Sequence, residues 1–272
     1  MSSEYEVVKS SEKIYTTKSL LNDFKNMGIK KGMTLIVHSS LSSIGWVCGG
    51  PIAVIEALIE AVGDSGNIVM PSHSGDYSEP SYWCNPEVPK KWHQVIRDEM
   101  PAFNPKITPC RSMGIIAQTF VNYEGVMRSY HPQVSFSAYG KYKEFITNNH
   151  SLEYGLSENS PIARLYDLDA NVLLLGVSYE NNTSFHLSEY RSNCREKYIS
   201  GAPIIENEVR LWKEFEDLEL DADGFEYIGE LFENEHDVVN YKLGNANCKL
   251  FSQRECVDFA TNFLSQSIIK NI

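Results

Sequence analysis

The sequence predicts a single α/β domain in which helices flank a partly parallel central sheet. Two observations support this fold class. A short apolar strand at 34–38, a glycine-rich loop, an amphipathic helix at 51–62 and a second strand at 67–71 form a β–α–β unit, and such a crossover connects parallel strands. A further apolar run at 172–177 has the composition of a strand buried on both faces.

The first part of the chain contains clear helix and strand signals. Residues 17–27 place Leu20, Leu21 and Phe24 on one side of a helix, and Gly28 follows as a stop signal. In the helix at 51–62, Pro51 suits the first turn, and glycines at 63 and 66 mark the turn into the strand at 67–71.

The middle of the chain loses this regularity. Residues 72–109 hold six of the 11 prolines and show no helical or strand period, so we expect a structured loop or lid there. Helical patterns return at 113–122 and 161–168, and a last one covers 254–264. With no internal repeat, we expect residues 1–272 to form one domain.

Composition excludes several classes of protein. At 272 residues, with 42% hydrophobic and 22% charged residues, the chain resembles an ordinary globular protein, and no apolar run is long enough to span a membrane. Because the N-terminus lacks the basic and apolar regions of a signal peptide, we expect a cytoplasmic protein. Six scattered cysteines form no CxxC pair, which favours free thiols over disulfides or zinc.

The negative charge is concentrated in one segment. Residues 206–237 contain 13 acidic and two basic residues, a net charge of −11 out of −12 for the chain. This imbalance argues against a nucleic-acid partner. We expect a solvated acidic face or a possible subdomain, which would attract a polycation if it bordered a cleft.

The most informative stretch follows the strand at 172–177. A polar turn leads to His186 and, three residues later, Glu189, which would share one face of a helix. A carboxylate beside an imidazole fixes its tautomer and stabilises its protonated form, as a general base requires. Taken alone, a polar turn with a histidine and a glutamate is more often structural than catalytic.

Two polar loops are candidates for binding a cofactor or phosphate. The loop at 38–50 carries Ser39, Ser40 and Ser42 before a helix, and Arg111 and Ser112 precede another. Neither loop has a nucleotide-binding glycine motif, so ordinary turn or surface roles remain open.

Two further clusters have open interpretations. His131, restricted by the following proline, and Ser135 would line a cofactor channel or be buried structurally. His73, Asp76 and Glu79 form an acidic and aromatic group suited to a cationic, hydroxylated ligand, or a solvated loop. The spacing of these groups specifies no metal, and no GxSxG or HExxH motif is present.

Taken together, these segments resemble the aminoglycoside 3-N-acetyltransferases, a family of antibiotic N-acetyltransferases. No single segment is specific, but their order is. They are VHSSLSSIG at 37–45 with GGP at 49–51, MPSHS at 70–74, residues 100–103 with 108–114, HPQVSF at 131–136, residues 155–161 and NTSFHLSE at 182–189.

The resemblance implies a fold particular to this family and acetyl transfer from acetyl-CoA to an amine of a cationic aminoglycoside. It implies that His186 is the base and Glu189 its support. It also implies that the acceptor lies near Asp76 and Glu79. The residues that it implies lie near coenzyme A are Ser39, Ser40, Ser42, Ser112, His131 and Ser135. Acetylation of another metabolic amine, or binding without catalysis, are the alternatives, and the oligomeric state is not indicated.

Overall fold

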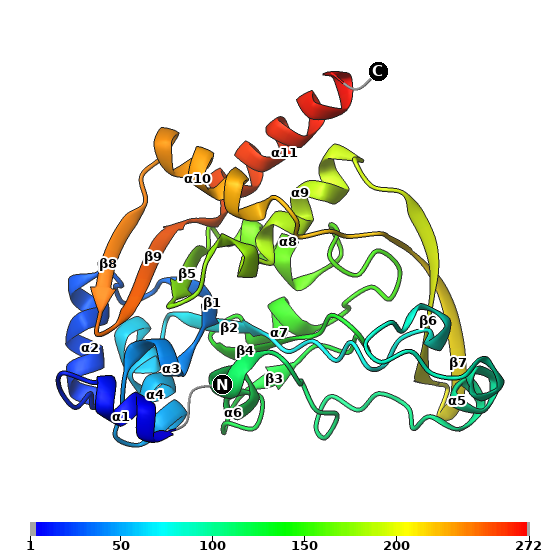
Figure 1. Cartoon of the computed structure of the whole chain (residues 1–272), viewed down its shortest axis with the longest axis horizontal. Helices are drawn as coiled ribbons and strands as arrows, with labels where there is room; N and C mark the ends of the chain where they lie inside the picture. Colours follow the sequence, from blue (N-terminus) through cyan, green and yellow to red (C-terminus); the bar gives the residue numbers. More distant parts are fainter. Residues whose placement is uncertain (1–3, 271–272) are drawn as a thin grey trace.

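The structure is a computed structural model that describes residues 4–270, and a seven-stranded mixed sheet lies at its centre (Figure 1). Strand β1 (Thr34–Ser39) pairs in parallel with β2 (Asn67–Pro71) on one side and β5 (Asn171–Leu175) on the other. The predicted parallel β–α–β unit is therefore confirmed, and the strand at 172–177 is the third parallel member.

Antiparallel strands extend the sheet at both edges. On the β2 side lie β4 (Phe136–Gly140) and β3 (Met127–Arg128). On the β5 side lie β9 (Ala246–Ser252) and β8 (Val239–Leu243), giving the order β3-β4-β2-β1-β5-β9-β8. The mixed sheet agrees with the predicted α/β class, although the antiparallel strands were not predicted.

Helices α2 (Thr17–Asn26), α4 (Gly50–Val62) and α6 (Gly114–Phe120) cover one face of the sheet. The short helices α1 (Glu4–Ser10) and α3 (Leu41–Ile44) lie near them (Figure 1). A capping box between Thr16 and Ser19 starts α2, and Gly63 ends α4 with a φ of +62° that favours glycine. The helices predicted at 17–27, 51–62 and 113–122 are confirmed within one to two residues.

The other face of the sheet is covered by α7 (Lys143–Thr147), α8 (Pro161–Asp167), α9 (Ser184–Ser192), α10 (Phe225–Glu235) and α11 (Gln253–Lys270). Side chains along β1 alternate between the two faces of the sheet, so that Leu35 and Val37 pack in the first core and Ile36 packs in the second. The result is a three-layer arrangement with the sheet in the middle.

The segment 72–109 and a long hairpin pack together at one end of the molecule. The segment contains three short helices, η1 (Pro80–Tyr82), η2 (Lys90–Trp92) and α5 (His93–Glu99), and the hairpin consists of β6 (Lys197–Glu206) and β7 (Val209–Leu218). Arg210 of β7 donates to the carbonyl of Met100, and the Phe103 amide donates to the Pro203 carbonyl at 3.0 Å.

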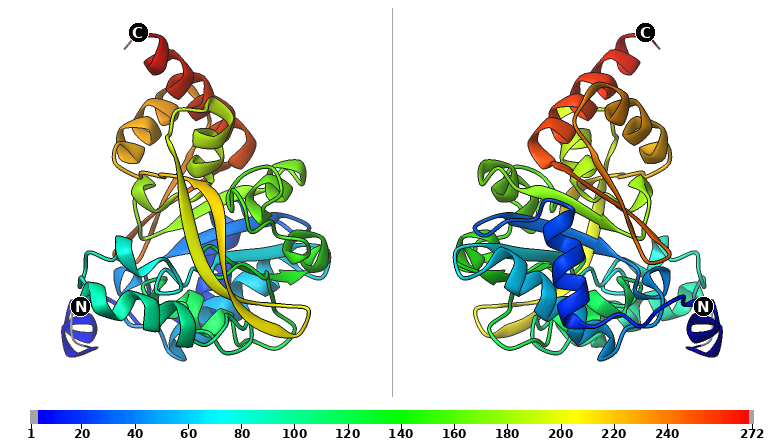
Figure 2. Two further views of the ribbon diagram at one scale, coloured as in Figure 1. Left: turned by 90° about the vertical axis from the view of Figure 1, so that its right-hand side faces the viewer. Right: turned by 90° about the vertical axis from the view of Figure 1, so that its left-hand side faces the viewer.

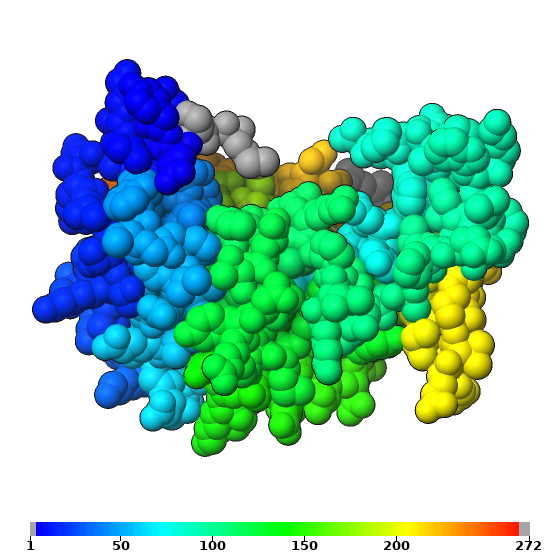
Figure 3. All heavy atoms as spheres, turned by 90° about the horizontal axis from the view of Figure 1, so that it is seen from below, coloured from blue at the N-terminus to red at the C-terminus, as the bar shows by residue number. Residues whose placement is uncertain are grey.

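The hairpin and the 72–109 segment also shape the surface of the molecule. Figure 2 shows the hairpin running along the flank of the molecule from the end of α9. In Figure 3, the 72–109 segment (cyan to green) and α1 (blue) stand on either side of a recess.

The acidic window at 206–237 comprises β7 and α10, with the connection between them. Helix α10 buries Phe225, Ile228 and Phe232 in the second core, so this part of the window shares its core with α9 and α11. The six cysteines, all in the described part of the chain, are free thiols. Among residues 4–270, no helix is long and apolar enough to cross a bilayer.

Candidate active site

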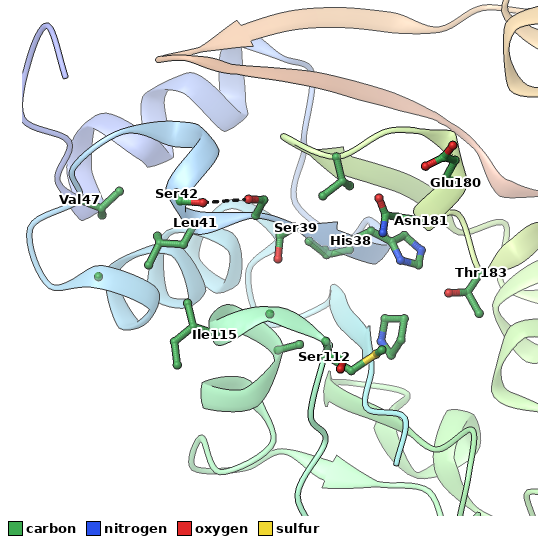
Figure 4. Close-up of a pocket in the computed structure, with 18 of the residues that line it drawn as sticks. His38, Ser39, Leu41, Ser42, Val47, Ser112, Ile115, Glu180, Asn181 and Thr183 are labelled. Carbon is green, nitrogen blue, oxygen red and sulfur yellow. Dashed lines mark hydrogen bonds between the residues drawn. The ribbon is translucent and has the colours of Figure 1, made fainter. Parts of the chain in front are cut away.

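A cavity of about 770 Å³ opens at the carboxyl ends of the parallel strands β2, β1 and β5. This edge is where open α/β sheets bind their ligands. Figure 4 shows one wall built by the loop after β1, a second wall by Ser112 and Ile115, and a third by the segment that includes η3 (Tyr179–Asn181). The lining combines apolar side chains with serines and three histidines: Val37, Leu41, Val47, Ile115, Ala117, Val177, Ser39, Ser40, Ser42, Ser112, His38, His73 and His186.

His186 and Glu189 form a bonded pair at the cavity wall. Both lie on α9, and His186 Nδ1 is 2.5 Å from Glu189 Oε2. The His186 side chain is 18% exposed and lines the cavity, whereas Glu189 is fully buried. Because the carboxylate accepts the Nδ1 proton, the neutral ring presents an unprotonated Nε2, which can accept a proton.

The start of α9 is fixed by neighbouring backbone and by α11. Asn182 accepts a hydrogen bond from the Ser184 amide at 3.2 Å, and its own amide donates to Cys256 Sγ on α11. One turn further along, the Ser188 hydroxyl donates to the Val257 carbonyl at 3.0 Å. These contacts hold the helix that carries the histidine and its acid.

The second oxygen of Glu189 is held by groups that the sequence did not reveal. Arg195 donates from Nε to Oε1, and the Asp221 amide donates to the same oxygen at 3.2 Å. The Arg195 guanidinium also donates to the Asp221 carbonyl at 3.0 Å. Burial of a carboxylate is costly unless its oxygens are paired and hydrogen-bonded in this way. No motif spacing marked Arg195, because its partners come together only in the fold.

The predicted serines gather at the cavity. Ser39, Ser40, Ser42 and Ser112 all line it, the first three on the loop after β1 and the last before α6. The Ser40 amide donates to the Leu175 carbonyl at 2.9 Å, which ties the loop to β5. Hydroxyls and apolar side chains on facing walls suit an extended arm that carries amide groups.

His131 and Ser135 lie outside the cavity lining, in the buried interior behind it. His131 Nδ1 accepts from the amides of Gln133 and Val134, and its Nε2 donates to the Leu152 carbonyl at 3.2 Å. Burial is the main reason that the pKa of His131 is well below its usual value. The ring is neutral and holds its own turn in place.

Ser135 belongs to a network around Arg128 that fixes the chain beyond β2. The Ser135 hydroxyl donates to the Ser72 carbonyl at 2.7 Å and accepts from Arg128 at 2.9 Å. Arg128 also donates to the carbonyls of Ser72 and Thr108, and so joins both ends of the 72–109 segment. Ser135 therefore supports the turn that carries His73.

The remaining predicted residues are not brought together. His73 lines the cavity, but Asp76 and Arg111 are exposed and lie 3.9 Å apart as a loose pair. Glu79 is paired with Arg97 inside the 72–109 segment. Although burial would raise its pKa, hydrogen bonds from Arg97 and Ser81 hold the pKa of Glu79 below its usual value. Among the described residues, no group of three or more His, Cys, Asp or Glu side chains could hold a metal ion.

The imidazoles of His38 and His73 line the same cavity as His186. Burial, and then repulsion from a charged His186, lowers the pKa of His38 to about 3. The same causes, with smaller effects from His38, His150 and Arg128, lower the pKa of His73 to about 3. Both rings are therefore neutral at neutral pH. His38 was not predicted as a site residue, because within the sequence it is only the last residue of an apolar strand.

This fold and site define an acyltransferase class. Residues 36–265 match the family model described as aminoglycoside 3-N-acetyltransferase, and the chain belongs to that family. The resemblance expected from the ordered motifs is confirmed.

Individual relatives cover nearly the whole chain. The SPbeta prophage-derived aminoglycoside N(3')-acetyltransferase-like protein YokD of Bacillus subtilis (strain 168) is 48% identical over 98% of each chain. The crystal structure of YokD covers 98% of this chain and 100% of its own, with a TM-score of 0.97. Aminoglycoside N(3)-acetyltransferase III of Pseudomonas aeruginosa is 28% identical over 92% of this chain and 93% of its own. The AAC-IIIb binary structure with CoASH is 25% identical, covers 94% of this chain and 98% of its own, and has a TM-score of 0.84.

Proposed function

We propose that the protein transfers the acetyl group of acetyl-CoA to an amine of an aminoglycoside, at the 3-amino group of the 2-deoxystreptamine ring. The observation that carries this proposal is the bonded His186–Glu189 pair facing a large cavity at the carboxyl edge of the parallel strands. Membership of the acetyltransferase family supports the reaction class. A bound CoASH in AAC-IIIb and bound sisomicin in AAC-VIa, both 25% identical to this chain, support the two substrates.

The cavity suits the arm of coenzyme A. Its serine hydroxyls, on the loop after β1 and before α6, can bond to the amide groups of the arm. Apolar side chains such as Leu41 and Ile115 can cover its methylene groups. The proposed placement directs the thioester toward the end of the cavity that holds His186.

Acetyl transfer requires an unprotonated amine, because only the nitrogen lone pair can attack the thioester carbon. His186 Nε2 would take the proton from the attacking nitrogen, and Glu189 would stabilise the imidazolium that forms. The proton then passes to the departing thiolate, so that His186 returns to its neutral form. Direct transfer between the two substrates needs no acyl-enzyme.

A thiol-release assay with acetyl-CoA and a panel of amines tests the proposal. The panel holds aminoglycosides with and without a free 3-amino group, together with simple polyamines, and mass spectrometry locates the acetyl group. We expect turnover with 3-amino aminoglycosides and a loss of about 10²–10⁴-fold in His186→Gln. His93→Gln, on α5 outside the cavity lining, is the matched control.

Each alternative has its own result in this panel. Acetylation of polyamines alone would replace the acceptor but keep the chemistry. Binding of acetyl-CoA without any acetylated product would indicate a binding protein. Normal turnover of His186→Gln would remove the base.

A further inference from the structure

Three neighbouring parallel strands each bring one histidine to the same cavity. His38 lies within β1, His73 follows β2 by two residues, and His186 is on the helix that follows β5. In the sheet, β1 stands between the other two strands. His38 therefore occupies the middle of this edge, directly before the serines of the first loop.

The Nε2 atoms of His38 and His73 both lack a hydrogen-bond partner among the described residues, and His38 is the more central of the two because β1 lies between β2 and β5. His38 is 7% exposed. His131 and His150, by contrast, use both ring nitrogens in hydrogen bonds. A buried polar group without a partner costs about 1–3 kcal/mol, and because the His38 side chain lines the cavity, a bound ligand toward which the ring turns would supply one.

The protonation state of the His38 ring limits the chemical roles that it can have. With a pKa of about 3, the His38 imidazole is neutral at any pH at which an amine could react. A base this weak does not compete with His186 for the proton of the attacking amine. A neutral imidazole retains one N–H, however, and can donate it to a developing negative charge.

We propose that His38 donates its N–H to the carbonyl oxygen of the acetyl thioester and stabilises the oxyanion formed during transfer. This inference rests on the proposed acetyl transfer and adds a catalytic residue to it. The opposite assignment, in which an imidazolium binds a coenzyme phosphate, conflicts with the neutral state of the ring.

The step balances around the two histidines. The amine lone pair forms the C–N bond while the C=O π electrons move to the oxygen. The His38 N–H donates a hydrogen bond to this negatively charged oxygen. His186 takes the proton from nitrogen. When the C=O bond re-forms, the C–S bond breaks, the thiolate leaves and takes that proton from His186. His38 keeps its own proton throughout.

Two substitutions separate donation from packing. His38→Leu fills the space without an N–H, whereas His38→Gln keeps an amide donor. We expect His38→Leu to lower kcat by about 10²–10³-fold with little change in the KM for acetyl-CoA, and His38→Gln to recover at least about tenfold of that loss. The acid limb of the pH–rate profile stays in place in both variants. His93→Gln again serves as the control.

A measurement without any acceptor provides the second readout. Infrared difference spectra of acetyl-CoA labelled with ¹³C at the carbonyl should show a lower C=O frequency on the native protein than on His38→Leu, because a hydrogen bond polarises the carbonyl. Thermal unfolding confirms that each variant is folded, and calorimetry measures donor binding. If a variant does not fold, the native and His38→Gln spectra are compared with free acetyl-CoA.

The outcomes distinguish the two levels of proposal. Failure of the native protein to bind acetyl-CoA would overturn the proposed function and this inference together. Normal acetyl transfer with His38→Leu at full kcat, or with the same carbonyl frequency as the native complex, would overturn the role of His38 alone. An equal loss in both variants with a raised KM would make His38 a residue of the binding wall.

Discussion

Replacing Glu189 with glutamine tests the proposed proton transfer most directly. Glu189 is fully buried, and its two oxygens have separate duties, one toward His186 Nδ1 and the other toward Arg195 and the Asp221 amide. Glutamine keeps the size of the side chain and one accepting oxygen but removes the charge. The substitution therefore leaves the cavity open and changes the energy of the imidazolium.

The size of the effect follows from the geometry. With hydrogen-bonded atoms 2.5 Å apart, the charge centres of His186 and Glu189 are about 4 Å apart, and at an effective dielectric constant of about 20 their attraction is roughly 4 kcal/mol. A neutral amide acceptor returns about 1 kcal/mol of this as an ordinary hydrogen bond. The remaining loss of about 3 kcal/mol in the transition state corresponds to roughly a 10²-fold fall in kcat.

The assay is thiol release at saturating acetyl-CoA, with the affinity for acetyl-CoA measured separately. Because Glu189 does not line the cavity, donor affinity should stay close to the native value. Glu158→Gln is the matched control, since that carboxylate is exposed and pairs with Arg191. A kcat for Glu189→Gln within about threefold of the native value would show that the Glu189 charge does not stabilise the imidazolium in the transition state.

Three other predictions concern neighbouring groups and the core. Arg195→Met, which removes the cation beside that buried carboxylate, should lower kcat by about tenfold, with Arg195→Lys recovering part of the loss; an unchanged rate would contradict a positioning role. The pKa values of His38 and His73, about 3, of His150, about 4, and of His131 all lie below the usual value of about 6.5, so the unfolded chain binds more protons below that pH. Their contribution to stability is complete above about pH 6.5 and is lost as the pH falls, by up to roughly 5.4 kcal/mol per pH unit for the four groups, and urea unfolding between about pH 7 and 5 should show a clear slope rather than a flat line. In Gly229→Ala, the new Cβ would lie 2.1 Å from the Tyr179 ring, and we expect a loss of about 1–3 kcal/mol in unfolding free energy, which calorimetry would disprove by showing a native Tm.

The parallel part of the fold could be predicted because its signals are local. A continuous apolar run, a glycine-rich loop and an amphipathic helix each need only a few neighbouring residues to be recognised. The β6–β7 hairpin lacks such a signal. Its two-residue turn, Asn207 and Glu208, has φ values of +51° and +65°, but the usual glycine is absent. Gly201 and Pro203 within β6 further hide the strand.

In the candidate site, too, residues close in sequence could be predicted, and contacts between distant residues could not. His186 and Glu189 are three residues apart, so their pairing followed from helix geometry. Ser39, Ser40 and Ser42 reach the cavity together because they share one short loop, whereas Ser112, 70 positions after Ser42, was expected there only from the order of the family motifs. Arg195 reaches Glu189 around the end of a helix, and the isolation of His38 is a property of the surrounding packing. Contacts of this kind depend on tertiary structure and produce no periodic pattern in the sequence.

The contacts between α9 and α11 have a consequence for synthesis of the protein. Asn182 and Ser188 bond to Cys256 and Val257, about 70 positions later in the chain. On the ribosome, the residues proposed to move the proton therefore emerge well before the helix that holds them in place. A premature stop codon ahead of α11 would remove the contacts that support these residues, so newly made chains should become active only after α11 has left the ribosome.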